Sequence, residues 1–457
     1  MPNPVDDTPL GPGKIALPLE ESGPSDVSHD PQPNADRARL QRFRRRVFYV
    51  VAVCCTTVLV TLWQHPPTVR HPIEDLAHVP LRTDIAHDPR LESYQTPEHA
   101  DSCAEWVTGQ EGLASASFEL PTAADLLFFL SRGPIFGHIS IIETPNSSTG
   151  PVEVNLTAQY QHSRKALEQT KVCRMGTGNE HGILVWAEPR HPHCDPTQDV
   201  RVNITVSLPT GVRNYKDLTT DLAQFSHSAG DFFSIWSPTS FEVIRLKTSN
   251  AAINFGSLVG RSALMQTTNA KLEGFFSGLE VSAQTSNAPI DLIAMMFGQR
   301  AGSESRVNLK NSNGAITVHL GLVSDFDDNV LRTTAHTSGA ALTIHAPARN
   351  MLAAARNASF FLDASTSVGP ATAHLYPGYE GSYDLQTTGR AKAQVEGAKD
   401  QADPLYRGRK RTVTHAKTGR HAQGDIFWTE DGKSPAGGVG RGSVKMTTFV
   451  SPVKMRV

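Results

Sequence analysis

The sequence lacks an excess of charge of either sign, since its 43 lysines and arginines nearly balance 45 aspartates and glutamates. This balance gives no overall field that would favour nucleic acid as a partner. The G-x-S-x-G motif is also missing, so a serine nucleophile of that type is not indicated. Apart from residues 47–63 there is no long uncharged apolar run, which excludes a second membrane-spanning helix.

The one apolar run, Val47 to Trp63, contains 17 residues without a charge. This length is at the lower end of what crosses a hydrocarbon core about 30 Å thick. The run begins after 46 residues and has no small-residue cleavage site at its end, which favours a signal-anchor helix over a removable signal peptide. A buried core helix is the alternative interpretation.

Flanking charges predict the orientation of this single span. Six arginines lie within residues 37–46, whereas residues 64–75 contain only Arg70, with two acids. Because positive charge stays on the cytosolic side, we expect a cytosolic N-terminus and a lumenal or extracellular C-terminus. All acceptor motifs for N-glycans follow the run, which agrees with this orientation. They are Asn146, Asn155, Asn203 and Asn357.

Composition divides the rest of the chain. We interpret residues 1–46 as a disordered cytosolic tail, because the first 36 are rich in Pro, Asp, Ser and Asn and poor in large apolar residues. Residues 64–102 contain frequent prolines and no sustained periodicity, which indicates an extended stem. Residues 103–457 are predicted to form an ectodomain.

The ectodomain pattern is that of β-strands, as in "VEVNLTA" (152–158), where apolar and polar residues alternate. One phrase then recurs, most clearly within residues 241–393: "LKTSNAAINF", "MQTTNAKLEG", "AQTSNAPIDL", "LKNSNGAITV", "AHTSGAALTI" and "LQTTGRAKAQ". Its bend falls at Asn250, Asn269, Asn287, Asn313, Gly339 and Gly389. The C-terminal "VKMTTFVSPVKMRV" is interpreted as a last copy.

Each part of the repeated phrase has a mechanical reason. Thr and Ser suit strands, and Asn or Gly tolerates the backbone of a sharp bend. Successive bends from Asn250 to Gly339 are 18–26 residues apart. Repeats of this length with one bend in register predict an all-β, β-solenoid-like ectodomain, with Thr and Asn ladders along the stack. The alternative is an antiparallel β-sandwich or meander in which the bends are only hairpin turns.

These segments resemble the putative-adhesin domain of unknown function found in bacterial and fungal envelope proteins. The similarity is greatest to basidiomycete membrane-anchored proteins, which share the basic patch before one anchor, the repeats, and regions like "YPGYEGSYDLQTTG" (376–389), "DPLYRGRKR" (403–411) and "GDIFW" (424–428). The resemblance covers roughly residues 110–457. It implies a β-rich fold, and it brings neither catalytic residues nor a cofactor.

Cysteines on the predicted lumenal side are Cys103, Cys173 and Cys194. An oxidising compartment favours one disulfide among them. The simplest pairing is Cys173–Cys194, which leaves Cys103 over.

Three short motifs have possible chemical roles, each with a plainer interpretation. "HPHCD" (191–195) offers zinc ligands, but no second cluster matches it and its prolines suit an exposed loop. The D-x-D of Asp325 and Asp327 is the pairing that Golgi glycosyltransferases use to hold a metal and a nucleotide sugar, but it lies between two repeats, where a solvated loop is expected. "RGRKR" (407–411) is a surface loop, a dibasic cleavage site after Lys410-Arg411, or a patch for acidic glycans.

The sequence therefore predicts a single-pass membrane glycoprotein with a non-catalytic, adhesin-like or scaffolding ectodomain and no metal or other cofactor. Expected partners are the bilayer, through residues 47–63, and glycans, wall polymers or other surface proteins. The alternative is a Golgi carbohydrate-active enzyme that uses Asp325 and Asp327.

Overall fold

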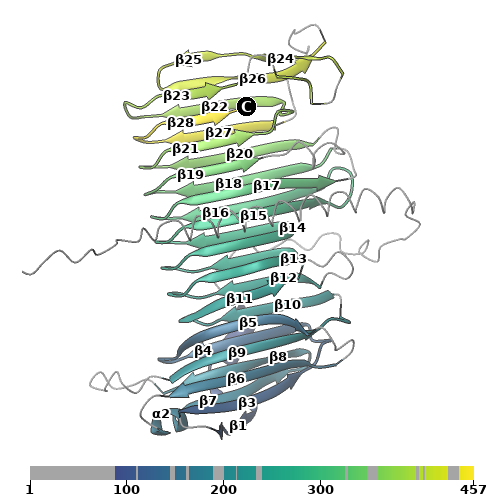
Figure 1. Cartoon of the computed structure of the whole chain (residues 1–457), viewed down its shortest axis with the longest axis vertical. Coiled ribbons are helices and arrows are strands. Elements are labelled where there is room, and N and C mark those ends of the chain that lie inside the picture. The colour runs from purple at the N-terminus through teal and green to yellow at the C-terminus, as the bar shows by residue number, and fades with distance from the viewer. Residues whose placement is uncertain are drawn as a thin grey trace, which may run out of the picture. The chain divides into compact units, whose positions relative to one another are not determined.

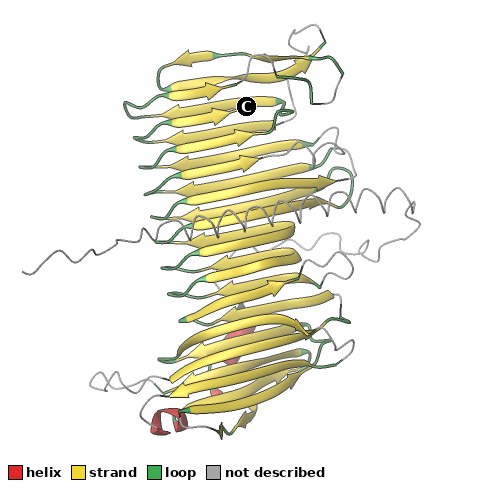
Figure 2. Ribbon diagram, viewed as in Figure 1, coloured by secondary structure: helices red, strands yellow, loops and turns green. Residues whose placement is uncertain are grey.

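The computed structural model describes residues 88–457, except 110–111, 145–149, 161–163, 189–199, 213, 233–238, 325–327, 347–357, 398–400, 405–406 and 431–441. The predicted tail, the predicted span and residues 64–87 of the predicted stem lie outside the described residues. None of the described helices is long and apolar enough to cross a membrane. The described chain is all-β apart from a few short helices, which confirms the all-β part of the predicted fold (Figure 2).

The N-terminal part, residues 88–209, is largely antiparallel. Its elements are η1 (Pro89–Tyr94), η2 (Pro97–His99), β1 (Ala100–Ala104), β2 (Val107–Thr108), β3 (Leu113–Leu120), β4 (Leu126–Arg132), β5 (Phe136–Thr144), β6 (Val152–Tyr160), α2 (Arg164–Glu168), β7 (Thr170–Thr177), β8 (Glu180–Ala187) and β9 (Val200–Pro209). The antiparallel pairs run β1–β7–β8 and β3–β6–β9. Strands β4 and β5 then pair in parallel with β8 and β9 and begin the next part of the sheet.

The middle part contains the repeats and pairs entirely in parallel. Its strands are β10 (Asn214–Asp221), β11 (Phe225–Asp231), β12 (Ser240–Lys247), β13 (Ile253–Gln266), β14 (Leu272–Thr285), β15 (Ile290–Gly298), β16 (Glu304–Asn311), β17 (Ile316–Ser324), β18 (Val330–Thr337), β19 (Leu342–Ala346), β20 (Ser359–Thr366) and β21 (Ala371–Leu375). From β14 to β19 each strand pairs with the strand two places later in the chain. The strands therefore form two rows, which Figure 1 shows as a stack.

We call these rows A and B. Row A contains β12, the C-terminal half of β13 and of β14, β16, β18 and β20, and row B contains β11, the N-terminal halves of β13 and β14, β15, β17, β19 and β21. The inward side chains of both rows belong to one continuous core. In β15, for example, Ile290, Leu292 and Ala294 are buried while Asp291 between them is exposed. One repeat buries its apolar side only by stacking on its neighbours.

The C-terminal part contains β22 (Gly381–Thr387), β23 (Ala393–Glu396), β24 (Lys410–Val413), β25 (Ala416–Thr418), β26 (His421–Thr429), β27 (Gly442–Thr448) and β28 (Val453–Arg456). The predicted last copy, β27 and β28, is inserted between β20–β21 and β22–β23. It is last in sequence but not last in the stack. Strand β26 closes row A by antiparallel pairing with β22 on one edge and with β24 and β25 on the other.

Residues 88–102, which the sequence analysis placed in the stem, pack against the folded part. In η1, Leu91 and Tyr94 are buried in a small apolar cluster with residues of β4, β7 and β8. The rings of Tyr94 and Phe128 stack with centroids 4.5 Å apart. Arg90 Nη2 also donates to Asp217 Oδ2 in β10 at 2.6 Å. Ordered structure thus begins before residue 103.

Candidate functional site

The turns between rows A and B carry a ladder of asparagine side chains at the predicted bends. Asn269 Nδ2 donates to Asn250 Oδ1 at 2.6 Å, and Asn287 and Asn313 continue the series with distances of 2.6 and 2.7 Å. In the next copy Gly339 takes the same place, and its backbone N–H donates to Ser312 O at 2.8 Å. Four successive layers therefore present one side-chain amide each at the exposed edge of the repeats.

A second ladder lies just inside the first. The buried Thr267 hydroxyl donates to Ala251 O at 3.2 Å, Thr337 to Gly314 O at 2.9 Å and Thr366 to Ala340 O at 3.0 Å. Each of these carbonyls follows the bend residue of the preceding copy, so the bond links neighbouring layers. Asn311 replaces threonine in one copy, and its amide donates to Ala288 O at 2.7 Å. The predicted Thr and Asn ladders are confirmed.

The outer face of row B carries three stacked imidazoles. The rings of His319 and His345 lie 4.4 Å apart, and those of His345 and His374 lie 4.7 Å apart. Partial burial, and then the neighbouring His345, lower the pKa of His374. Stacked rings of this kind face their neighbours instead of converging on one point, and no cluster of three metal-ligating side chains occurs anywhere in the described parts of the chain.

A recess lined by charged side chains lies at the C-terminal end of row A. It has a volume of about 680 Å³ and is lined by β22, β26 and β27, by Thr414 and His415 between β24 and β25, and by Ala416 of β25. We call it the cap groove. Its outward side chains are Ser382 and Asp384 from β22, Gln423 and Asp425 from β26, and Ser443 and Lys445 from β27. They are brought together because the three strands pair side by side.

Strand register places these six side chains in two lines across the groove. Ser382 pairs with both Asp425 and Ser443, and Asp384 pairs with both Gln423 and Lys445. Neighbouring strands lie about 4.8 Å apart, so the groups in each line are close neighbours. A donor-only ammonium and acceptor-only carboxylates therefore occur together with hydroxyl and amide groups.

Hydrogen bonds hold one wall of the cap groove. Tyr383 Oη donates to the carbonyl oxygen of Thr414 at 2.6 Å, so its contact with His415 Nδ1 at 2.7 Å must be a bond that His415 donates. Burial, and then the Asp425 carboxylate, raise the pKa of Tyr383 to about 12. The backbone N–H of Asp425 donates to Thr414 Oγ1 at 2.8 Å. Residues 414 and 415 are thus fastened to both β22 and β26.

Two charged groups in the cap groove have no side-chain partner in the described structure. His421 Nε2 lies 2.8 Å from Asp384 Oδ1, so that carboxylate has a partner. Within the described structure, neither the Asp425 carboxylate nor the Lys445 ammonium has a hydrogen-bond or ion-pair partner. A ligand in the groove can therefore donate to one unpartnered carboxylate and accept from one unpartnered ammonium.

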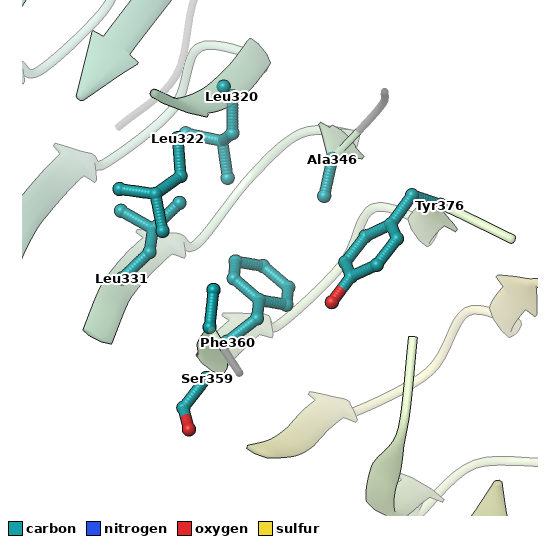
Figure 3. A pocket seen from close by; sticks show the side chains of 9 residues that line it. Leu320, Leu322, Leu331, Ala346, Ser359, Phe360 and Tyr376 are labelled. Carbon is teal, nitrogen blue, oxygen red and sulfur yellow. The ribbon is translucent and has the colours of Figure 1, made fainter. Parts of the chain in front are cut away.

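A second, much smaller cavity lies in the core between β17, β18, β19 and β20 (Figure 3). Its volume is about 20 Å³, and its lining is mostly apolar, with Leu320, Leu331 and Phe360 beside Tyr376. This volume is about that of one water molecule. We regard it as a packing defect and not as a ligand site.

The structure places only some of the predicted site residues. Asn155 is exposed on β6, and Asn203 on β9 is half-buried. Asn146, Asn357, the D-x-D residues Asp325 and Asp327, and the "HPHCD" segment lie outside the described residues. Beside the D-x-D, the buried Asn329 uses its Oδ1 to accept from Ser303 N at 3.0 Å and from Ser303 Oγ at 2.7 Å. That amide oxygen therefore joins the turn before β18 to the turn before β16.

The predicted disulfide between Cys173 and Cys194 was wrong, because Cys173 is bonded to Cys103. The antiparallel pairing of β1 with β7 places these two residues directly opposite each other. Cys194 lies outside the described residues. Sequence spacing favoured the nearer cysteine, since nothing in it revealed that β1 adds to the edge of β7.

The basic segment is partly ordered. Arg409 Nη2 lies 3.0 Å from Asp403 Oδ1, and Arg409 Nη1 lies 2.9 Å from Glu380 Oε1, with the arginine side chain 14% exposed. Lys410 and Arg411 belong to β24, which pairs with Trp428 and Thr429 of β26. Lys410 and Arg411 therefore lie in a paired edge strand and not in a surface loop.

No family model matches the chain, and no curated protein matches it. Among solved structures, it is similar to a putative adhesin from Bacteroides fragilis at 10% identity and a TM-score of 0.32, over 76% of this chain and 98% of the other. A putative cell adhesion protein from Clostridium sporogenes matches at 6% identity and a TM-score of 0.17, over 75% and 98%. A putative adhesin from Parabacteroides merdae matches at 9% identity and a TM-score of 0.26, over 58% and 97%. Because all three scores are below 0.5, we base the functional proposal on this chain alone.

Proposed function

We propose that this chain is a single-pass membrane glycoprotein that presents a non-catalytic β-solenoid as an adhesin-like or scaffolding surface. Residues 47–63 anchor it in the bilayer, with the N-terminus in the cytosol, and Asn146, Asn155, Asn203 and Asn357 accept glycans. The expected partners are glycans, wall polymers or other surface proteins.

The observation that carries this proposal is the pair of ladders at the turns. They use polar side chains to join one layer to the next, as in the bond from Asn269 to Asn250 and that from Thr337 to Gly314. Side chains that bond each other across layers stiffen a scaffold and expose a regular polar edge. Such an edge suits binding by shape and many weak polar contacts, which requires no catalytic group.

Display of the full chain on cells would test the proposal. We expect cells that express it to attach to polysaccharide-coated or cell-coated surfaces more strongly than cells with an empty vector. An epitope at the C-terminus should be accessible to antibody on intact cells, and glycosidase treatment should reduce the mass of the protein. Attachment equal to that of the vector control, or a C-terminus accessible only after permeabilisation, would overturn the proposal.

The alternative hypothesis, a glycosyltransferase that uses Asp325 and Asp327, has a separate test. If Asp325 and Asp327 hold a metal and a nucleotide sugar, the purified full chain should bind a uridine-diphosphate sugar only when manganese is present, and D325N/D327N should abolish the binding. We expect no manganese-dependent binding. Binding that the double variant removes would favour the glycosyltransferase.

A further inference from the structure

We propose that the cap groove binds a neutral oligosaccharide, with Asp425 and Lys445 as its main hydrogen-bonding groups. This inference rests on the proposed adhesive function and names the class of ligand and the place where it binds. It concerns the groove between β22, β26 and β27 described above, at the C-terminal end of row A.

The chemistry of the lining favours a ligand rich in hydroxyl groups. Asp425 can only accept hydrogen bonds and Lys445 can only donate them, and a hydroxyl group can do both. Ser382, Ser443 and Gln423 add groups that either donate or accept. A polyol can therefore satisfy every group in the two lines, whereas an apolar ligand would leave them unpaired at a cost in free energy.

The balance of charge favours a neutral ligand. Asp384 is bonded to His421, which cancels its charge only when the imidazole is protonated, so the groove holds two carboxylates and one ammonium. This excess of one carboxylate gives a polyanion no net attraction, and the Lys445 ammonium opposes a polycation. A charged polysaccharide would also bring like charge against either Asp425 or Lys445.

Size and rigidity agree with this assignment. A volume of about 680 Å³ lies in the usual range for sites that hold molecules the size of a short oligosaccharide. Four of the lining side chains project from paired strands whose inward neighbours, Tyr383 and Val444, are buried. The backbone of such a frame does not need to become ordered on binding, which favours affinity. The site is open and polar, so we expect weak single-site binding that surface display multiplies.

The test uses the purified full chain in detergent micelles and saturation-transfer NMR with four neutral tetrasaccharides: cellotetraose, laminaritetraose, maltotetraose and chitotetraose. Trigalacturonate serves as the charged comparison. We expect at least one neutral tetrasaccharide to bind and trigalacturonate to bind more weakly. D425A and K445A should each weaken that binding about tenfold, the size of effect expected when one charged hydrogen-bonding partner is lost.

Matched controls separate the groove from general charge effects. D291N and K310A change an exposed aspartate and an exposed lysine outside the groove and should leave the affinity unchanged. D425N keeps an acceptor oxygen and should lose less affinity than D425A. Unfolding curves for all variants show whether the fold is intact, and a variant that unfolds is replaced by D425N/K445Q, which nearly preserves side-chain size.

The outcomes are decisive for the groove. The inference is overturned if none of the four neutral tetrasaccharides binds, if trigalacturonate binds best, or if the folded groove variants bind like the wild type. Attachment of cells that display the D425A/K445A chain distinguishes the two proposals. Attachment equal to that of the wild type, with no tetrasaccharide binding, removes the groove assignment and leaves the adhesive function standing.

Discussion

Thr220 Oγ1 lies 2.8 Å from His227 Nε2 inside the core. His227 Nδ1 lies 3.0 Å from Phe225 O and must donate to it, because a carbonyl oxygen only accepts. In the neutral imidazole Nε2 is therefore the acceptor, and Thr220 donates to it. Complete burial of the ring disfavours a second, charge-bearing proton.

This buried histidine predicts that acid destabilises the fold. Burial lowers the pKa of His227 to about 4, against an ordinary value of 6.5. As pH falls below 6.5 the unfolded chain takes up a proton that the folded chain does not, so stability is lost progressively toward pH 4. The loss from this group alone should reach about 3 kcal/mol. Denaturant unfolding at pH 7.5, 6.5, 5.5 and 4.5 measures it, and H227Q should flatten the profile; an unchanged profile in H227Q would contradict the assignment.

Removal of one rung of the asparagine ladder should weaken the repeats slightly. N269A removes the bond donated to Asn250 and the bond accepted from Asn287. Because the site is exposed, water replaces part of each bond, and we expect a loss of about 1 kcal/mol in the free energy of unfolding. N254A is the control, since Asn254 is exposed on β13 and lies outside the ladder. Equal losses in N269A and N254A would show that the ladder contributes nothing.

The disulfide should make a larger contribution. It joins cysteines 70 residues apart in sequence, and restricting an unfolded loop of that length contributes about 4 kcal/mol in the chain-entropy description. We expect C103S to lower the unfolding free energy by an amount of that order. Peptide mapping without reduction should recover residues 103 and 173 in one linked fragment. A fragment that links Cys173 to Cys194 instead would refute the pairing.

The dibasic pair at Lys410-Arg411 should resist proteolysis in the folded chain. A protease needs an extended, unpaired substrate, and both residues are paired with β26. Arg411 Nη1 also donates to Gln401 Oε1 at 2.6 Å. Incubation with a protease specific for Lys-Arg pairs should leave the native chain intact there and cut it after heat unfolding. A cut after Arg411 at native temperature would mean that β24 opens readily.

The repeats were predictable from sequence because their signal is local. Thr and Asn recur beside each bend, and both ladders appear at those positions. The prediction of an all-β fold needed only alternating apolar residues and bends. Each repeat of about twenty residues contains both. The pairing of the inserted copy, β27 and β28, was not predictable, because no local feature tells a copy which neighbour it will join.

The cap groove was out of reach of the sequence for the same reason. Asp384 and Asp425 are 41 positions apart by number and meet only through the antiparallel pairing of β22 with β26. The segments "YPGYEGSYDLQTTG" and "GDIFW" contain them, so resemblance marked both regions, but nothing in either segment indicated that they are adjacent. The disulfide failed in the same way, since Cys103 reaches Cys173 through the pairing of two edge strands.

The bond between Cys103 and Cys173 also determines how tension would travel through the protein. If the chain is pulled from its N-terminal side, the covalent link passes the load from β1 directly into β7, and the edge strand cannot be peeled away first. A partner bound at the cap groove would therefore be joined to the N-terminal side through a covalent link between β1 and β7, and not through the hydrogen bonds of those two strands alone.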